Sequence, residues 1–133
     1  VLNLVVGGWR CDAVKYAGNR HNWGNGLEAT VPAPGMTDLF AYAGAFSNAP
    51  TTAGGRVLGA SLLGAAHRLD LLYMTCGDQD GISWPVYLGA MNGLAEAAGD
   101  KLANLVRVDI PGGVHDFGVW LHGAYHFARL AFR

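Results

Sequence analysis

Two consecutive strand-loop-helix units in the second half of the chain restrict its fold more than any other feature. Residues 69–76, LDLLYMTC, form a short apolar run typical of a buried strand, and the loop GDQDG follows. Residues 83–98 predict a helix that starts at Ser83 with proline in its first turn and stops at Gly99. Residues 105–110, LVRVDI, alternate like a strand, PGG ends it, and residues 116–132 repeat apolar positions at helical spacing. This order predicts parallel strands joined by right-handed crossovers.

The first half carries weaker signals of the same kind. Residues 1–6 read as an apolar strand, residues 10–26 as a loop, residues 39–47 as a strand of small residues and residues 56–69 as a short helix. We therefore expect one domain over residues 1–133, with an α/β fold. In the last helix, the apolar spacing predicts a buried face and an exposed His122. The predicted buried face comprises Phe117, Trp120, Leu121, Phe127 and Ala128.

Composition supports a largely buried sheet and argues against several functions. Hydrophobic residues make up 51% of the chain and charged residues 14%, against about 25% charged in an average soluble domain. That balance favours parallel strands covered on both faces. A net charge of −1 provides no basic field for nucleic acid or for an acidic membrane surface. No run of 18 apolar residues predicts a membrane span, and the opening valine suggests a mature or excised segment.

The two loops of the second half carry residues that suit hydrolytic chemistry. Asp80 follows one strand and His115 follows the next, with a single helix between them. Because neighbouring parallel strands end at the same edge of a sheet, we expect the Asp80 carboxylate to reach the His115 ring. An acid that holds an imidazole in one tautomer is the orienting part of a hydrolytic triad. Asp78 is a second candidate for the acid, although it could instead cap the turn in the same loop.

These motifs resemble the putative-esterase family of α/β-hydrolases, which includes esterase D-like enzymes and feruloyl and acetyl-xylan esterases. The resemblance runs from about residue 37 to the end, through TDLFAYAGAFSNAP, LDLLYMTCGDQDG and IPGGVHDFGVWLHGAYHFARLAF. It implies a shortened α/β-hydrolase-like parallel sheet with flanking helices, Asp80 as the triad acid and His115 as the base. By the same resemblance, Ser47 corresponds to a family position that is not the nucleophile.

The chain departs from this family at the nucleophile. The elbow Gly-x-Ser-x-Gly, which presents the attacking serine on a sharp turn, is absent. Ser61 in GASLLG comes nearest to it, and Cys11 is a second candidate, as a thiol nucleophile. The strand VLNLVV, followed by Gly7 and Gly8, resembles the family's strand before the oxyanion loop. Either the elbow segment is deleted, or the residues shown are part of a longer working enzyme.

The remaining polar residues suggest structural roles. Asp116 is placed to cap the last helix, where a carboxylate accepts from exposed N–H groups. His122 and His126 have the spacing of metal ligands but lack the glutamate of a zincin motif, so we expect no metal there. Cys11 and Cys76 lack metal-ligand spacing, and two buried thiols are the simpler reading than a disulfide. We expect no cofactor.

The function expected from this combination is carboxylic ester hydrolysis by serine-type acyl transfer. The resemblance implies a small-molecule or polysaccharide-linked ester as substrate, possible secretion, and no nucleic-acid or membrane partner. The alternative is a catalytically impaired or truncated α/β-hydrolase-like module that binds or supports other molecules. A nucleophile positioned beside His115 would distinguish the two.

Overall fold

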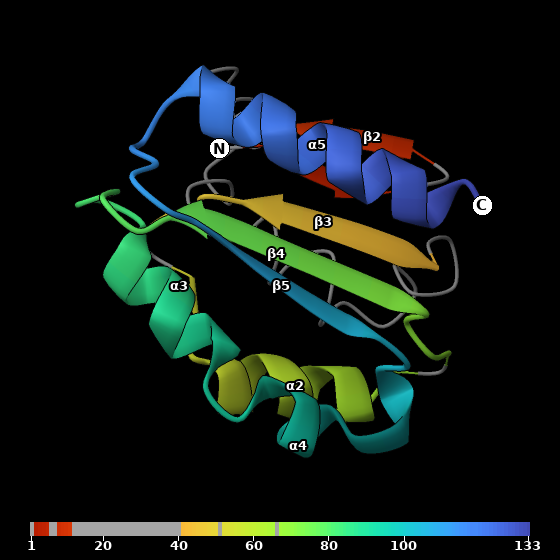
Figure 1. Ribbon diagram of the computed structural model, residues 1–133. Coiled ribbons are helices and arrows are strands. Elements are labelled where there is room, and N and C mark those ends of the chain that lie inside the picture. The colour runs from red at the N-terminus through yellow and green to blue at the C-terminus, as the bar shows by residue number, and fades with distance from the viewer. Residues whose placement is uncertain (1, 6–7, 12–40, 51, 66) are drawn as a thin grey trace.

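The computed structural model of the protein describes residues 2–5, 8–11, 41–50, 52–65 and 67–133, with side chains from residue 41 onward. Five strands form one sheet in the order β2-β1-β3-β4-β5 (Figure 1). Their bounds are Leu2–Val5 for β1, Gly8–Cys11 for β2, Tyr42–Phe46 for β3, Leu71–Gly77 for β4 and Leu105–Ile110 for β5. Strands β3, β4 and β5 are parallel, as the crossover pattern predicts, whereas β1 and β2 are antiparallel additions.

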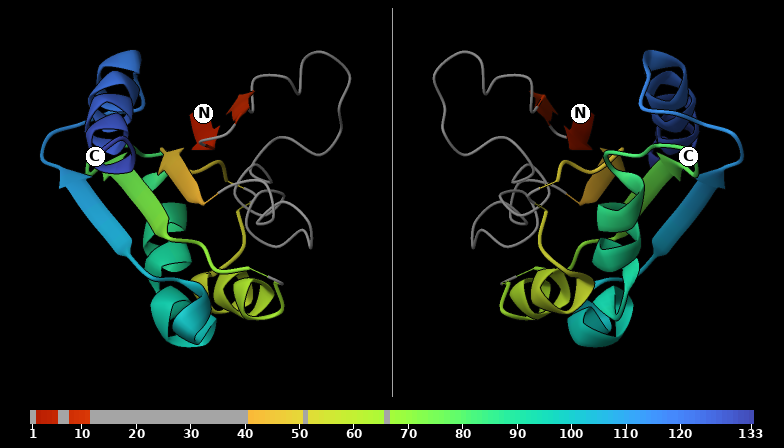
Figure 2. Two further views of the ribbon diagram at one scale, coloured as in Figure 1. Left: turned by 90° about the vertical axis from the view of Figure 1, so that its right-hand side faces the viewer. Right: turned by 90° about the vertical axis from the view of Figure 1, so that its left-hand side faces the viewer.

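Helices cover both faces of this sheet (Figure 2). One face carries α2 (Gly55–Leu63), α3 (Trp84–Met91) and α4 (Leu94–Ala98), and the other carries α5 (Phe117–Ala131). A short 3-10 turn, η2 (Gly99–Lys101), leads from α4 toward β5. The chain therefore has a small α/β fold with a three-stranded parallel sheet and flanking helices. None of the described helices is long and apolar enough to cross a membrane.

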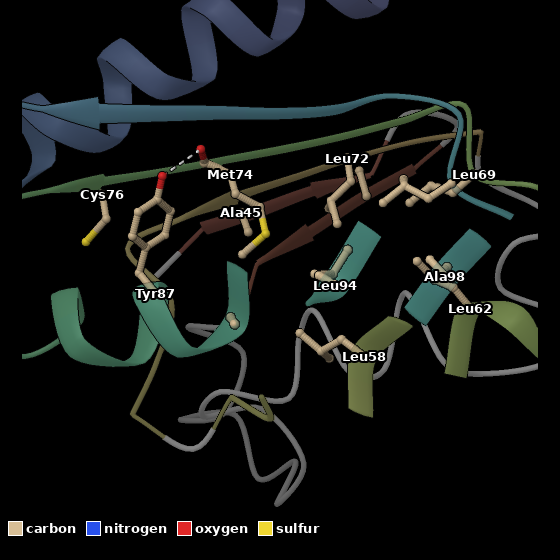
Figure 3. Packing of buried hydrophobic residues seen from close by; sticks show 13 residues of the cluster. Ala45, Leu58, Leu62, Leu69, Leu72, Met74, Cys76, Tyr87, Leu94 and Ala98 are labelled. Carbon is tan, nitrogen blue, oxygen red and sulfur yellow. Dashed lines mark hydrogen bonds between the residues drawn. The ribbon is translucent and has the colours of Figure 1, made fainter. Parts of the chain in front are cut away.

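Each face of the sheet has its own apolar cluster. On the α2 to α4 face, Leu72 and Met74 of β4 pack against Leu58 of α2, Tyr87 of α3 and Leu94 of α4 (Figure 3). The hydroxyl of Tyr87 points back to the sheet, where it donates to Met74 at 3.4 Å and to the carboxylate of Asp109 at 2.7 Å. The hydroxyl of this buried tyrosine is therefore hydrogen-bonded at the surface of the sheet.

Phe46, Tyr73 and Phe127 form the centre of the other cluster, under α5. Their ring centroids lie 6.0 to 6.2 Å apart in tilted and edge-to-face arrangements, the spacing that aromatic pairs prefer. Gly123 brings α5 close to the sheet, because a Cβ there would lie 2.4 Å from the Phe46 ring. The close packing of α5 thus depends on a residue without a side chain.

The burial of α5 corrects part of the sequence prediction. Phe127 is buried and His122 is exposed, as predicted, but Phe117 and Leu121 are 71% and 61% exposed. Trp120 and Ala128 are only partly buried. The buried residues of the helix are Val119, Gly123 and Phe127. The prediction considered only the large apolar residues of the helix, whereas α5 approaches the sheet most closely at Gly123.

Two predicted helices are also shorter than their patterns suggested. The helix predicted over residues 56–69 ends at Leu63, and Gly64 follows as its C-cap. The helix predicted over residues 83–98 is divided into α3 and α4, because Gly93 adopts a left-handed φ of 70°. The loop predicted over residues 10–26 begins later, since Arg10 and Cys11 belong to β2, and its remaining residues lie outside the described ones.

Candidate active site

The loops that follow β4 and β5 lie against each other at the carboxyl end of the parallel strands. Gly77 at the end of β4 is in register with Ile110 at the end of β5. A tight turn follows β5, with Pro111 first and Gly112 at a φ of 70°. The N–H of Gly113 donates to the Ile110 carbonyl at 3.1 Å and closes this turn. The N–H of Gln79 donates to the Gly113 carbonyl at 2.9 Å. The convergence predicted for these loops is therefore present.

Two glycines allow the loops to touch backbone to backbone. A Cβ on Gly77 would lie 2.2 Å from the carbonyl oxygen of Gly113, and a Cβ on Gly113 would lie 2.9 Å from the Cα of Gly77. Asp78 adds a cross-link, since its Oδ1 accepts from the N–H of Gly112 at 2.8 Å. Asp78 thus joins the two loops, and Asp80 is the acid of this loop that contacts His115.

Asp80 makes that contact. Its Oδ2 lies 2.8 Å from Nδ1 of His115, the hydrogen bond that the order of the motifs predicts. Its Oδ1 accepts from the backbone N–H groups of Ile82 and Ser83, at 3.0 and 2.8 Å. The Asp80 side chain is fully buried, whereas the His115 side chain is 21% exposed. The acid is therefore enclosed and the ring remains open to solvent on part of its surface.

The surroundings of Asp80 determine its charge and the tautomer of His115. Burial raises the pKa of Asp80, but the N–H of Ser83 and the His115 ring outweigh it, so the pKa lies below its ordinary value. Asp80 is consequently ionised at neutral pH and can only accept hydrogen bonds. Nδ1 of a neutral His115 must then carry the proton, which leaves Nε2 as the proton acceptor.

Two further side chains contact His115 that the sequence did not indicate as its neighbours. The Ser83 hydroxyl lies 3.2 Å from Nδ1, the same nitrogen that faces Asp80. Ser83 occupies the N-cap position of α3, as predicted, but its side chain makes no capping hydrogen bond and turns to the ring instead. Trp120 packs its ring edge-to-face with that of His115, with centroids 5.2 Å apart. The His115 ring is thus contacted by Ser83 at the start of α3 and by Trp120 of α5.

Among the described side chains, the predicted nucleophile Ser61 is not brought to His115, and neither is Ser47. The Ser61 hydroxyl donates to the Val57 carbonyl, one turn earlier in α2, at 3.0 Å. Ser47, at the end of β3, has a φ of 53° and is completely buried, so a substrate cannot reach its hydroxyl in this conformation. Cys11 lies in β2, and its side chain is outside the described residues. Among the described side chains, no serine or cysteine hydrogen-bonds to Nε2 of His115.

Gly8, one of the two glycines that the resemblance assigns to an oxyanion loop, is not placed beside His115 either. Gly8 pairs with Val5, and Val5 pairs with Ala43 at the start of β3, the end of the sheet opposite to Asp80 and His115. Gly7 lies outside the described residues. The resemblance led us to expect Gly8 at the carboxyl edge, but the antiparallel pairing of β1 places it at the other edge.

The remaining candidates have structural contacts. Asp116 caps α5 as predicted, since its carboxylate accepts from the N–H of Val119 at 3.0 Å. The rings of His122 and His126 contact each other along α5 in a tilted arrangement, with centroids 4.4 Å apart. Cys76 is a free, buried thiol in β4. Within the ranges that the structure describes, no three histidine, cysteine or acidic side chains gather into a group that could hold a metal ion.

Neither a scan against protein-family models nor a search of the solved structures gives a match for this chain. The residues at the carboxyl edge of the sheet are therefore the basis for assigning a function.

Proposed function

We propose that this chain is an α/β-hydrolase-like domain that hydrolyses carboxylic esters, with His115 as the general base and Asp80 as its orienting acid. The observation that carries this proposal is the 2.8 Å hydrogen bond between a buried carboxylate and a partly exposed imidazole. Its position at the ends of two adjacent parallel strands is where α/β folds place ligands. The order of acid and then histidine is also that of α/β-hydrolases.

The geometry supports a two-step proton transfer. Nε2 of His115 takes a proton from the group that attacks the ester carbonyl, and the ionised Asp80 stabilises the imidazolium that forms. The tetrahedral intermediate then collapses, its bond to the leaving oxygen breaks, and His115 returns the proton to that oxygen. The products are an alcohol and a carboxylic acid.

None of the three serines is presented to Nε2, so we propose water as the attacking group in this chain by itself. Without a nucleophile elbow we expect no acyl-enzyme and a low rate on simple aryl esters. General-base catalysis by a positioned side chain contributes about 10²- to 10⁴-fold, which is still measurable against the uncatalysed reaction.

The first prediction is that hydrolysis of p-nitrophenyl acetate depends on His115. His115→Ala and Asp80→Asn should each lower the rate by about tenfold or more, since general-base catalysis needs both the imidazole and its tautomer. Ser61→Ala should leave the rate unchanged, because its hydroxyl is bonded within α2. The measurement is the steady-state release of p-nitrophenol at pH 7.5.

A double variant, His122→Ala with His126→Ala, is the matched control, because these imidazoles lie on α5 and take part in none of the described ion pairs. It accounts for the slow reaction that any accessible imidazole gives with activated esters. Equal losses in this control and in His115→Ala would refute a special role for His115. Complete loss of activity in Ser61→Ala would instead identify Ser61 as the nucleophile.

The alternative function, a binding module without catalysis, is favoured by the absence of a positioned nucleophile among the described residues. It predicts that His115→Ala leaves ester hydrolysis at the level of the wild-type chain. The same assay therefore separates the two functions.

A further inference from the structure

A second concave surface lies on the α5 face of the sheet, away from Asp80 and His115. It is a groove of about 440 Å³ between β5 and the second half of α5. Its apolar side chains are Tyr73 of β4, Val106 and Val108 of β5, and Leu130 of α5. A volume of this order lies within the range of pockets for small organic molecules.

The remaining lining of this groove is basic. His122, His126 and Arg129 lie along α5 at intervals of four and three residues, which places them on one side of the helix, and Arg133 follows just after the helix ends at Ala131. No acidic residue is among the described residues that line the groove. This surface is therefore positive in a chain whose net charge is −1.

The four basic side chains are not neutralised by carboxylates of the described part of the chain. The described ion pairs involve Arg56, Arg68, Arg107 and His115. Arg129 instead stacks on the Tyr125 ring at 5.7 Å, and Nε of Arg133 donates to the Arg129 carbonyl at 3.2 Å. In the neighbouring groove, Asp70 is already paired with Arg68 at 2.8 Å. The charge of the groove is thus available to a ligand.

Tyr73 places a buried hydroxyl in the lining of this groove. Its side chain is 1% exposed and lines the groove, and its hydroxyl makes no hydrogen bond to the described residues. Thr75 lies near it, and because the Thr75 hydroxyl donates to the Val108 carbonyl at 2.7 Å, its oxygen can only accept from the phenol. A ligand acceptor in the groove would compete with this oxygen for the phenol proton.

We propose that this groove binds a small organic monocarboxylate, with its apolar body on Tyr73, Val106, Val108 and Leu130 and its carboxylate toward the basic side chains of α5. The apolar floor favours an amphipathic anion over a fully hydrated one such as inorganic phosphate. The guanidinium groups of Arg129 and Arg133 provide charge-assisted hydrogen bonds. The site goes beyond the proposed hydrolysis and uses neither Asp80 nor His115.

The test uses 4-phenylbutyrate and its neutral amide, 4-phenylbutyramide, titrated into the ¹⁵N-labelled chain. We expect saturable chemical-shift changes in residues 106–108 and 122–133 with the acid, and binding at least about tenfold weaker for the amide, because it lacks the charge. Arg129→Gln combined with Arg133→Gln should weaken binding of the acid by a similar factor. Tyr73→Phe, which keeps the ring and removes the hydroxyl, should weaken it severalfold.

Arg56→Gln is the matched control, because Arg56 is an exposed arginine of α2 on the opposite face of the sheet. It should bind the acid as the wild-type chain does, and so should His115→Ala, which separates this site from the proposed hydrolysis. Equal binding of acid and amide, shift changes confined to residues that do not line the groove, or equal losses in Arg56→Gln and the double arginine variant would each overturn the proposal. No saturable binding would overturn it as well.

Discussion

Asp80 is a residue whose hydrogen bonds all favour its ionised form. Two backbone N–H groups hold one oxygen and the His115 ring holds the other. A carboxylate that is fully buried but so bonded orients its partner more rigidly than an exposed one, because it has no alternative contacts with water. Burial also changes the pKa of the Cys76 thiol, which lies beside Asp80.

We predict that Cys76 is inert toward alkylating reagents in the folded chain. Burial and, second, the Asp80 carboxylate, 3.8 Å from Sγ, together raise the pKa of its thiol to about 12. The thiolate that reacts is therefore scarce at pH 8. In a Cys11→Ala variant, iodoacetamide should label Cys76 only after denaturation, as measured by mass spectrometry. Labelling of the native chain at the rate of the unfolded chain would contradict this environment.

At this scale, the sequence predicted the pair and missed its neighbours. Asp80 and His115 could be paired because each follows a strand, and consecutive parallel strands end at one edge. The contact of Ser83 with His115 depends on how the loop of residues 78–83 folds around the carboxylate, which no periodicity encodes. Its only signal is a serine three residues after the acid.

Glycines decide how closely the elements approach. The two loops of the site meet at Gly77 and Gly113, α2 meets α4 at Gly59, and α5 meets β3 at Gly123. Sequence periodicity ranks helix faces by their large apolar residues, so it placed Phe117 and Leu121 in the core and overlooked Gly123. It also extended one helix across Gly93, where the left-handed φ ends α3 and starts α4. Element type was thus predictable, while the boundaries and the packed faces were not.

We predict that Gly77→Ala damages the site and the fold together. The added methyl group would meet the backbone of Gly113, which cannot rotate away, so the free energy of unfolding should fall by roughly 1–3 kcal/mol, as in overpacked cores. His115-dependent ester hydrolysis should fall as well, because the loops must separate. Urea denaturation and the p-nitrophenyl acetate assay measure the two effects.

Gly81→Ala is the matched control in the same loop, since nothing lies within 4 Å of the Cβ it would add. It should leave stability unchanged or raise it by up to about 1 kcal/mol through the unfolded chain. If Gly77→Ala proves as stable and active as Gly81→Ala, the two loops do not meet as described.

The ionisation of Asp80 makes the free energy of unfolding of the whole chain depend on pH. The folded-state pKa of Asp80 is lowered, so the unfolded chain takes up the proton first as the pH falls. The stability that the ionised carboxylate contributes is complete above about pH 4–5 and declines as the pH passes down through the folded-state value. The contribution of Asp109 to stability also declines as the pH falls, because its hydrogen bond with Arg107 lowers its pKa.

We therefore predict that the difference in free energy of unfolding between the wild-type chain and Asp80→Asn is largest near neutral pH and shrinks toward pH 2. Asp109 is present in both chains, so the comparison isolates Asp80. Urea denaturation between pH 2 and pH 7 measures the difference. A constant or growing difference toward acid pH would mean that the Asp80 carboxylate is not stabilised in its ionised form.

The most direct test of the central claim is the tautomer of His115, because the proposed base requires Nε2 to be free. Long-range ¹H–¹⁵N correlation spectra at pH 8, assigned by comparison with His115→Ala, report which ring nitrogen carries the proton. We predict protonation at Nδ1 in the wild-type chain and loss of that preference in Asp80→Asn, since the carboxylate at 2.8 Å is its cause. A His115 ring protonated at Nε2 in the wild-type chain would contradict the account.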